Sequence, residues 1–252
     1  MHENIISINT LMDQEEVAAQ FKKYGFTSMP VVDNENRLVG IITVDDVMDI
    51  VVEEATEDLA KMAAILPGDR PYMRTSVWEN FNKRSPWLLL LMVSAAFTGA
   101  IISSFEAALS VYSALIAFIP MLMGTGGNAG GQASVTVIRG LSMGEIEYRD
   151  VPGVMWKEIR VATLCGLCLA LANFGKLMLI DQVGVPVALV VSLTLIVVVL
   201  MAMLLGCLLP VLAKRIGLDP AVMASPFITT IVDALSLIVY FRVAVIILGI
   251  NV

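Results

Sequence analysis

The side chains on which many enzymes and zinc sites depend are scarce in this chain of 252 residues. Its single histidine is His2, and its three cysteines, Cys165, Cys168 and Cys207, all fall in apolar runs. A structural zinc site needs four such ligands, and acid–base catalysis relies most often on histidine. The sequence shows no nucleophile–base pair, phosphate-binding loop or zinc motif. We therefore expect no enzyme activity, and we interpret the cysteines as buried, inert thiols.

Charged residues are also few. They make up 15% of the chain, and 58% of it is hydrophobic, whereas soluble domains are about 25% charged and roughly 45–50% apolar. The net charge of −7 argues against a nucleic-acid partner, because phosphate binding needs clustered lysine and arginine. The apolar excess lies almost entirely after Pro86, whereas most acidic residues lie in the first 60. This asymmetry predicts a small aqueous segment followed by a membrane domain.

Five apolar stretches after residue 85 reach the length of about 20 residues that a membrane-spanning helix needs. They cover about residues 86–105, 111–138, 161–180, 183–213 and 220–250. We predict a mostly α-helical protein with a five-helix transmembrane domain at 86–252. A small α/β regulatory segment at 1–66 and a linker region at 67–85, with a helix at 75–85, precede it.

The lysine and arginine residues near the ends of these stretches predict their orientation. Basic residues precede the first stretch and separate the second from the third and the fourth from the fifth: Arg70, Arg74, Lys83, Arg84, Arg139, Arg149, Lys157, Arg160, Lys214 and Arg215. The opposite connections carry essentially only Lys176. Because basic loops stay in the cytoplasm, we expect a cytoplasmic N-terminus and an external C-terminus.

The first 66 residues alternate between helix and strand patterns. Asp13 is a suitable N-cap for a helix over 15–24. Short apolar runs at 29–32 and 37–42, separated by a turn, predict two strands. An acidic helix is expected from Val44 to Leu66, ending before a Pro-Gly break. This order of elements predicts a small α/β segment.

A glycine-rich run at 124–132 interrupts the second apolar stretch. Four glycines in seven residues make a poor helix, because each costs about 1 kcal/mol relative to alanine. We expect irregular backbone here, which membranes tolerate only against protein or a water-filled cavity. Free carbonyls, with the amides of Asn128 and Gln132, could then face a cation. The alternative is close helix–helix packing, for which Gly127 and Gly131 have the G-x-x-x-G spacing; we favour the pore.

Asp233 lies about 13 residues into the fifth stretch, near the middle of the membrane at about 1.5 Å per residue. A carboxylate there costs at least about 2.5–3.5 kcal/mol unless it faces water or a partner. Lys176 and Arg242 lie toward the outer ends of their stretches, so an ion pair is the less favoured interpretation. Thr229 shares a helical face with Asp233. These oxygen ligands suit a hard cation such as Mg²⁺, without excluding Ca²⁺ or Mn²⁺.

A cluster of acidic residues occupies the helix expected after Val44. Its members are Asp45, Asp46, Asp49, Glu53, Glu54, Glu57 and Asp58. Spacings of three and four place several on one helical face. A solvated face and a metal-sensing surface are equally consistent with this pattern.

Taken together, these features resemble the MgtE family of magnesium channels over essentially the whole chain. The matching residues are Pro120, the run GTGGNAGGQ at 124–132, DPA at 219–221, SP at 225–226, and Asp233. The runs GIITVDDVMD at 40–49 and EATED at 54–58 look like the end of the family's second CBS motif. The family also carries an N-terminal helical domain and a first CBS motif, which this sequence lacks.

The resemblance implies a homodimer in a bacterial or archaeal cell membrane, with a Mg²⁺ pore between the subunits. The second and fifth helices would line it. The implied pore contacts are Asp233, Asn128, Gly127 and Thr229, with Gly124, Gly131, Gln132 and Thr230 as further lining residues. The implied cytoplasmic Mg²⁺ sensor is Asp13, Asp46, Asp49, Glu54, Glu57, Asp58 and Asp219, acting on the plug helix at 75–85.

Two further functions remain open. Thr43 and Asp46 resemble the nucleotide-ribose contact of CBS domains, which would make ATP a partner. An ion-coupled secondary transporter of divalent cations could also use Asp233 and a broken helix. Such carriers usually have paired interruptions, and this sequence has one interruption and no internal repeat. A membrane-anchored sensor would leave Asp233 and the glycine run without a purpose, so we favour the channel.

Overall fold

The computed structural model describes residues 5–68, 70–105 and 110–249. The chain divides into two compact units, Met1–Ala60 and Lys61–Val252. The division falls inside a long helix, slightly before the boundary predicted at residue 66. Helices dominate both units, and the small sheet belongs to the first.

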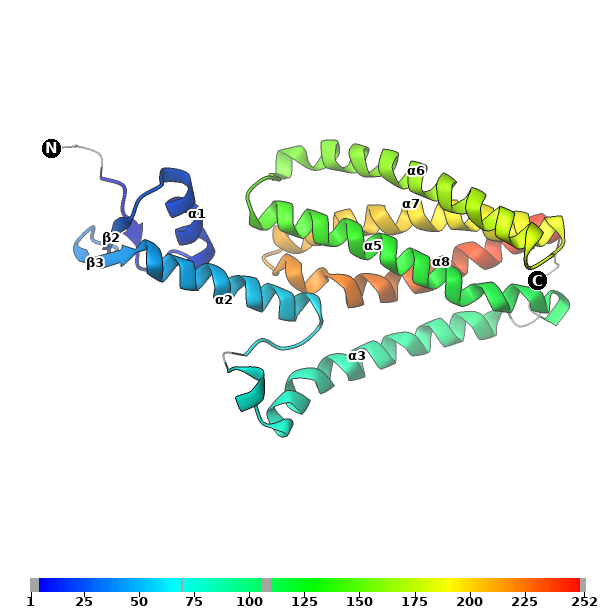
Figure 1. Cartoon of the computed structure of the whole chain (residues 1–252), viewed down its shortest axis with the longest axis horizontal. Coiled ribbons are helices and arrows are strands. Elements are labelled where there is room, and N and C mark those ends of the chain that lie inside the picture. Colours follow the sequence, from blue (N-terminus) through cyan, green and yellow to red (C-terminus); the bar gives the residue numbers. More distant parts are fainter. Residues whose placement is uncertain (1–4, 69, 106–109, 250–252) are drawn as a thin grey trace. The chain divides into compact units, whose positions relative to one another are not determined.

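The first unit is a three-stranded sheet with two helices (Figure 1). In chain order its elements are β1 (Ile8–Asn9), α1 (Gln14–Tyr24), β2 (Ser28–Val32), β3 (Leu38–Thr43) and α2 (Val44–Met62). The strand order is β1-β2-β3; β1 runs parallel to β2, and β3 runs antiparallel to it. Both predicted strands are present, and α2 ends four residues before the predicted Leu66.

Helix α1 shows why the local sequence specifies its ends. Asp13 accepts a hydrogen bond from the backbone N–H of Glu15 at 2.9 Å, which satisfies one of the free donors of the first turn. Gly25 ends the helix in the left-handed conformation, with φ of 65°. Between these caps, Val17 and Phe21 lie one turn apart and enter the small core of this unit. The predicted capping role of Asp13 is confirmed.

The second unit is a helical bundle. Its long helices are α3 (Val77–Ser104), α5 (Ile119–Ser142), α6 (Val151–Leu179), α7 (Val185–Arg215) and α8 (Ser225–Leu248). Short 3₁₀ turns precede four of them, at Tyr72–Arg74, Ser113–Phe118, Tyr148–Asp150 and Pro220–Met223. Helix α7 packs against α5, α6 and α8, and α3 packs against α8. As a consequence α7 is the most buried of the membrane-length helices.

Four helical segments of the described residues are long and apolar enough to cross a membrane: Val77–Ser104, Tyr148–Leu179, Val185–Arg215 and Pro220–Leu248. They correspond to the first, third, fourth and fifth predicted spans. Helix α5 has 24 residues, enough to span, but its glycines and amides lower its hydropathy below that of the others. The prediction of five spans therefore requires that α5 also cross the membrane.

The core of the bundle lies between α5, α7 and α8, where buried aromatic residues need specific partners. Tyr240 is fully buried, and its hydroxyl donates a hydrogen bond of 3.0 Å to the carbonyl oxygen of Leu115. Phe241 stacks on Phe105, with ring centroids 4.6 Å apart. The Tyr240 bond ties the 3₁₀ turn before α5 to α8, and it gives the buried phenol the partner that it needs. The stacking of Phe105 on Phe241 ties the end of α3 to α8.

Helix α3 joins two elements that the sequence predicts separately. It runs without a break from Val77 through Pro86, whereas we expected a linker helix at 75–85 and a span from residue 86. Ser76 caps the helix by accepting a hydrogen bond from the backbone N–H of Glu79 at 3.1 Å. Pro86 lacks one helical hydrogen bond but does not end the helix.

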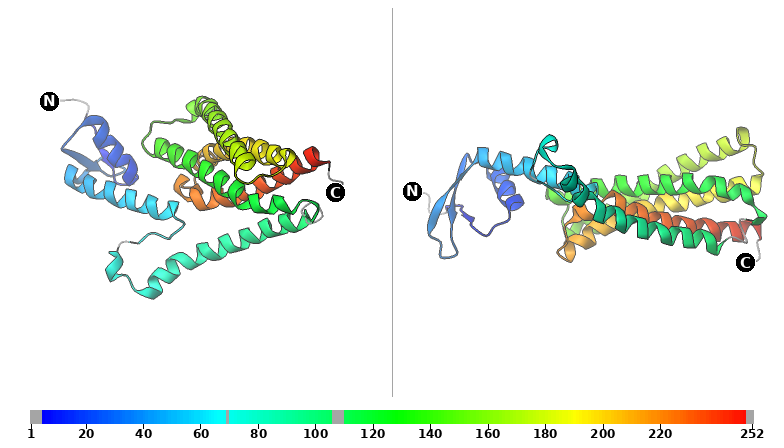
Figure 2. Two further views of the ribbon diagram at one scale, coloured as in Figure 1. Left: turned by 45° about the vertical axis from the view of Figure 1, so that its right-hand side comes forward. Right: turned by 90° about the horizontal axis from the view of Figure 1, so that it is seen from below.

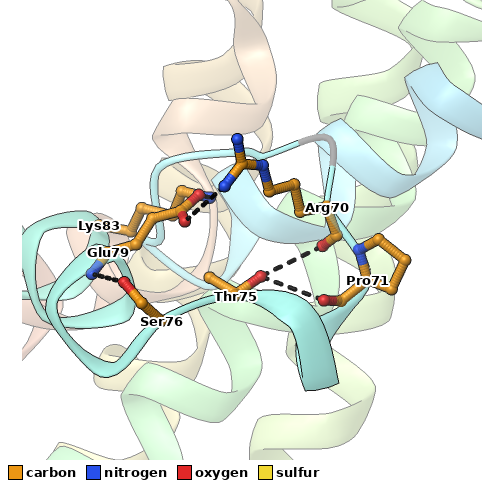
Figure 3. Close-up of polar contacts among 6 residues, drawn as sticks. All are labelled: Arg70, Pro71, Thr75, Ser76, Glu79 and Lys83. Carbon is orange, nitrogen blue, oxygen red and sulfur yellow. Dashed lines mark hydrogen bonds and ion pairs between the residues drawn. The ribbon is translucent and has the colours of Figure 1, made fainter.

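The loop before α3 is held onto its first turns by polar contacts (Figure 3). The carboxylate of Glu79 lies 2.9 Å from Lys83 Nζ and 3.8 Å from Arg70. The hydroxyl of Thr75 donates to the carbonyl oxygens of Arg70 and Pro71 at 3.4 and 3.2 Å. These contacts set the direction in which α3 leaves the loop.

One end of the bundle gathers the α5–α6 and α7–α8 connections, as Figures 1 and 2 show. There Lys214 Nζ, near the end of α7, donates a hydrogen bond of 3.1 Å to the carbonyl oxygen of Leu141 near the end of α5. Val137, Leu141, Cys207 and Val211 form a buried cluster beside this contact. The basic residues of both connections therefore lie at the same end of the bundle.

The cysteines differ from the expectation. Cys207 is buried, but Cys165 and Cys168 are exposed on α6. Helix α6 packs chiefly against α7, and these two cysteines lie on a part of α6 that the described residues leave exposed. An apolar sequence cannot distinguish a face that meets protein from one that meets lipid.

Candidate cation pathway

The glycine run does not break the helix. Residues 124–132 lie within the continuous helix α5, so their carbonyls accept helical hydrogen bonds and are not free for a cation. The expectation of irregular backbone here is wrong. The propensity cost of about 1 kcal/mol per glycine is outweighed by the close packing that glycine permits.

The buried face of α5 shows what the glycines do. A Cβ atom on Gly126 would lie 2.8 Å from side-chain carbons of Val198 and Val232, and one on Gly130 would lie 2.8 Å from Ile228. A Cβ on Gly127 would overlap the methyl group of Thr229. Glycine thus brings α5 into contact with α7 and α8. The alternative interpretation, packing of small residues, holds for this face.

The opposite face of α5 is polar and exposed in this chain. Gly124, Asn128, Gln132 and Thr136 are all exposed and follow one another at intervals of four residues, so they form one stripe along the helix. Among the residues that the structure describes, the side-chain amides of Asn128 and Gln132 make no hydrogen bond. We call these four residues the polar stripe. Gly131, which we expected to line the pore, is buried instead.

Helix α8 runs antiparallel to α5 along this contact. Gly130 faces Ile228, Gly127 faces Thr229, and Gly126 faces Val232 and Ser236. One turn farther along α8 from Thr229 is Asp233, and one turn back along α5 from Gly127 is Gly124. Asp233 therefore lies at about the level of Gly124, where an added Cβ would meet nothing within 4 Å. The carboxyl group and the start of the polar stripe occupy the same level of the bundle.

Asp233 lacks a counter-charge in the described part of the chain. Its Oδ1 atom is buried and has no hydrogen-bond partner there. Lys176 is 2.6 Å from Asp181, and Arg242 is exposed and forms no ion pair with any described residue. The alternative of a structural ion pair therefore fails for these two cations. A cation that does not belong to these side chains can therefore approach the carboxyl group of Asp233.

The two threonines near Asp233 lie in different surroundings. The hydroxyl of Thr230 donates to the carbonyl oxygen of Pro226 at 2.9 Å, so it is used within the helix. Thr229 lies against Gly127 and shares the face of Asp233. Sequence reasoning missed Ser236, whose Oγ is buried without a partner among the described residues. Its position three residues after Asp233 is the signal that could have identified it.

The acidic residues predicted to sense Mg²⁺ hold several different positions. Asp49 is exposed on α2, and Glu54, Glu57 and Asp58 are half-buried there. The structure groups no three histidine, cysteine, aspartate or glutamate side chains as a metal site within the described residues. Within the described part of a single chain, the predicted sensor residues therefore do not form a cluster of three.

Asp219 belongs to the second unit and already has partners. Its Oδ1 accepts a hydrogen bond from the backbone N–H of Ala221 at 2.8 Å, and its Oδ2 lies 2.5 Å from Lys61 Nζ. A cation that bound Asp219 would therefore compete with Lys61 for the same carboxylate.

Thr43 and Asp46, the residues that resemble a nucleotide contact, bind each other. The carboxylate of Asp46 accepts hydrogen bonds from the hydroxyl and the backbone N–H of Thr43, at 2.5 and 3.0 Å. The hydroxyl contact, followed by the backbone one, lowers the pKa of Asp46 below its usual value. Thr43 immediately precedes α2, so the Asp46 carboxylate, which accepts the Thr43 N–H, supplies one half of a capping box at the start of the helix. The geometry explains the motif without a nucleotide.

Comparison with known proteins identifies the family. A family model described as a divalent cation transporter, MgtE, matches residues 119–243, and a CBS-domain model matches residues 1–53. The chain belongs to the MgtE family. The MgtE match spans α5 to α8, and thus includes both the polar stripe and Asp233.

Three relatives carry the name magnesium transporter MgtE. The proteins from Thermus thermophilus, Bacillus subtilis and Enterococcus faecalis are 39%, 37% and 32% identical to this chain. Each alignment covers 97% of this chain, but only 54%, 53% and 53% of the respective relatives. The chain therefore spans about half the length of these MgtE proteins. Family membership and the membrane-length helices together make it an integral membrane protein.

Proposed function

We propose that this chain forms the pore-containing part of a Mg²⁺-selective channel, in which hydrated Mg²⁺ passes between two copies of α5 and α8. The single observation that carries the proposal is the unpaired carboxyl group of Asp233 beside the exposed polar stripe. Asn128 and Gln132 would be costly against lipid, because their amides would lack hydrogen-bond partners. A water-filled passage between two copies would supply those partners.

The chemistry of the stripe suits a hydrated ion. Mg²⁺ sheds water reluctantly and usually keeps several water ligands. Two Asp233 carboxylates, one from each copy, would attract the ion, and the amides of Asn128 with the hydroxyl of Thr229 would bind its water shell. Because α5 is a regular helix, side chains rather than freed carbonyls make these contacts.

For regulation, we place the cytoplasmic Mg²⁺ sensor in the acidic set of Asp13, Asp46, Asp49, Glu54, Glu57, Asp58 and Asp219. Bound cations would offset the repulsion between these carboxylates and hold the closed state, so that loss of Mg²⁺ opens the pore. This assignment puts the N-terminus in the cytoplasm, in agreement with the basic connections gathered at one end of the bundle.

The test of the pore is Mg²⁺ flux into liposomes that contain the purified chain. Asp233→Asn and Asn128→Ala should each reduce flux or selectivity for Mg²⁺ over Ca²⁺. Asn173→Ala is the matched control for Asn128→Ala, because Asn173 is also an amide in a membrane-length helix but lies on α6. Wild-type flux and selectivity in both pore variants would refute the proposal. Flux that stops when a pH or Na⁺ gradient is removed would indicate a coupled carrier instead.

The test of the sensor changes Glu54, Glu57 and Asp58 to glutamine or asparagine together. This triple variant should conduct at internal Mg²⁺ concentrations that close the unmodified channel, because the carboxylates that bind the ion are gone. Unaltered inhibition by internal Mg²⁺ would refute the sensor while leaving the pore assignment standing.

A further inference from the structure

Two adjoining cavities lie at the end of the bundle where the α5–α6 connection meets the end of α7. The first has a volume of about 350 Å³ and is lined by the α5–α6 connection and Lys214. The second has a volume of about 550 Å³ and is lined mainly by α7. Tyr148 lines both cavities and so joins them. The proposed pore uses neither cavity.

The walls of the first cavity carry an excess of positive charge. Arg149, Lys214 and Glu147 line it, and the Arg149 guanidinium lies 3.0 Å from the Glu147 carboxylate. Glu147 is thus neutralised. Lys214 donates one hydrogen bond to the Leu141 carbonyl, and its ammonium group keeps two further donors. Arg215, which lines the second cavity, has no ion pair with a described residue. The uncompensated charges favour an anion.

The second cavity has a different character. Apart from Tyr148 and Arg215, its lining is aliphatic: Val151, Leu208, Val211 and Leu212. The last three belong to α7, which has the highest mean hydropathy of the membrane-length helices. An aliphatic cavity beside cationic side chains fits a molecule with an anionic group at one end and a hydrocarbon chain at the other. Tyr148 between them is suited to the boundary between lipid and water.

We propose that these two cavities together bind one anionic phospholipid. Lys214 and Arg215 hold its phosphate, with Arg149 beside them, and one acyl chain occupies the aliphatic cavity. Basic pockets between membrane helices on the cytoplasmic side recognise anionic headgroups in this way. A free phosphate ion shares the headgroup chemistry but would leave the aliphatic cavity unused. The aliphatic cavity is therefore the part of the site that distinguishes a lipid from inorganic phosphate.

The experiment is native mass spectrometry of the full chain, released from detergent with added phosphatidylglycerol or with zwitterionic phosphatidylcholine. Phosphatidylglycerol should be retained preferentially. Arg215→Gln should weaken its retention about fivefold, as expected for one basic residue near an anionic headgroup. Lys157→Gln is the matched control, because it removes one positive charge from the start of α6 without lining either cavity.

A second pair of variants tests the acyl cavity and does not depend on charge. Leu212→Trp should fill the cavity and reduce retention of phosphatidylglycerol, whereas Leu189→Trp, on the same helix and outside the cavity, should not. The two leucines are similarly exposed, at 42% and 41%, so Leu189→Trp is a matched control for the added size of the side chain. In a third experiment, inorganic phosphate is added to the full chain, and the thermal stability of the chain is measured.

The proposal is overturned if the two lipids are retained equally, or if Arg215→Gln behaves like Lys157→Gln. It is also overturned if Leu212→Trp retains lipid as well as Leu189→Trp. Stabilisation by inorganic phosphate equal to that by phosphatidylglycerol would show that only an anion site exists. All these readouts measure binding and stability, so they are independent of whether the chain transports Mg²⁺.

Discussion

Replacing Gly127 with alanine tests the contact on which the pathway's geometry depends. A Cβ at this position would overlap the methyl group of Thr229 on α8, so α5 and α8 must separate locally. Overpacking a close contact costs about 1–3 kcal/mol, and alanine recovers about 0.5–1 kcal/mol in helix propensity relative to glycine. We therefore expect Gly127→Ala to destabilise the chain by about 1 kcal/mol net, although the same change usually stabilises a helix.

The matched control is Gly124→Ala on the same helix. There an added Cβ meets nothing within 4 Å, so only the propensity gain of about 0.5–1 kcal/mol remains. In detergent, Gly124→Ala should unfold at a higher temperature than the unmodified chain, and Gly127→Ala should unfold at a lower one. For proteins of this size, 1 kcal/mol shifts Tm by roughly 2–4 °C, which such an assay resolves.

A compensating change identifies the atom responsible. Thr229→Ser removes the methyl group that the new Cβ would strike and keeps the hydroxyl. The double variant Gly127→Ala with Thr229→Ser should therefore recover most of the stability lost in Gly127→Ala, as a coupled pair in a double-mutant cycle. If Gly127→Ala melts as high as Gly124→Ala, or if Thr229→Ser gives no recovery, the argued contact between α5 and α8 is wrong.

Two further predictions concern single hydrogen bonds. Tyr240→Phe should lower the free energy of unfolding by about 1 kcal/mol, because it removes the hydrogen bond that the buried hydroxyl donates to the carbonyl oxygen of Leu115; an unchanged thermal midpoint would contradict this. Thr43→Val should raise the pKa of Asp46 toward its usual value in an NMR titration. The Thr43 bonds lower that pKa, so their stabilisation exists at neutral pH and disappears as pH falls through the lowered value. An unshifted midpoint would show that the backbone bond alone suffices.

Much of this protein follows from its sequence. The segregation of apolar residues after Pro86 predicts the membrane domain, because about 20 consecutive apolar residues are stable only in lipid or a deep core. Asp13 marks the start of α1, since a capping carboxylate acts on the N–H groups of its immediate neighbours. Asp233 stands out because one carboxylate in an apolar run is costly wherever the chain folds.

Tertiary structure decided the remainder. Propensity predicts a broken helix at residues 124–132, but propensity is local, and the contacts of Gly126, Gly127 and Gly130 with neighbouring helices outweigh it. Packing also decided that Cys165 faces outward and Cys207 inward, although both lie in apolar runs. Likewise, only packing separated buried Gly131 from the polar stripe. The physical reason is common to all: composition determines whether a helix enters the membrane, whereas its orientation depends on the shapes of the helices beside it.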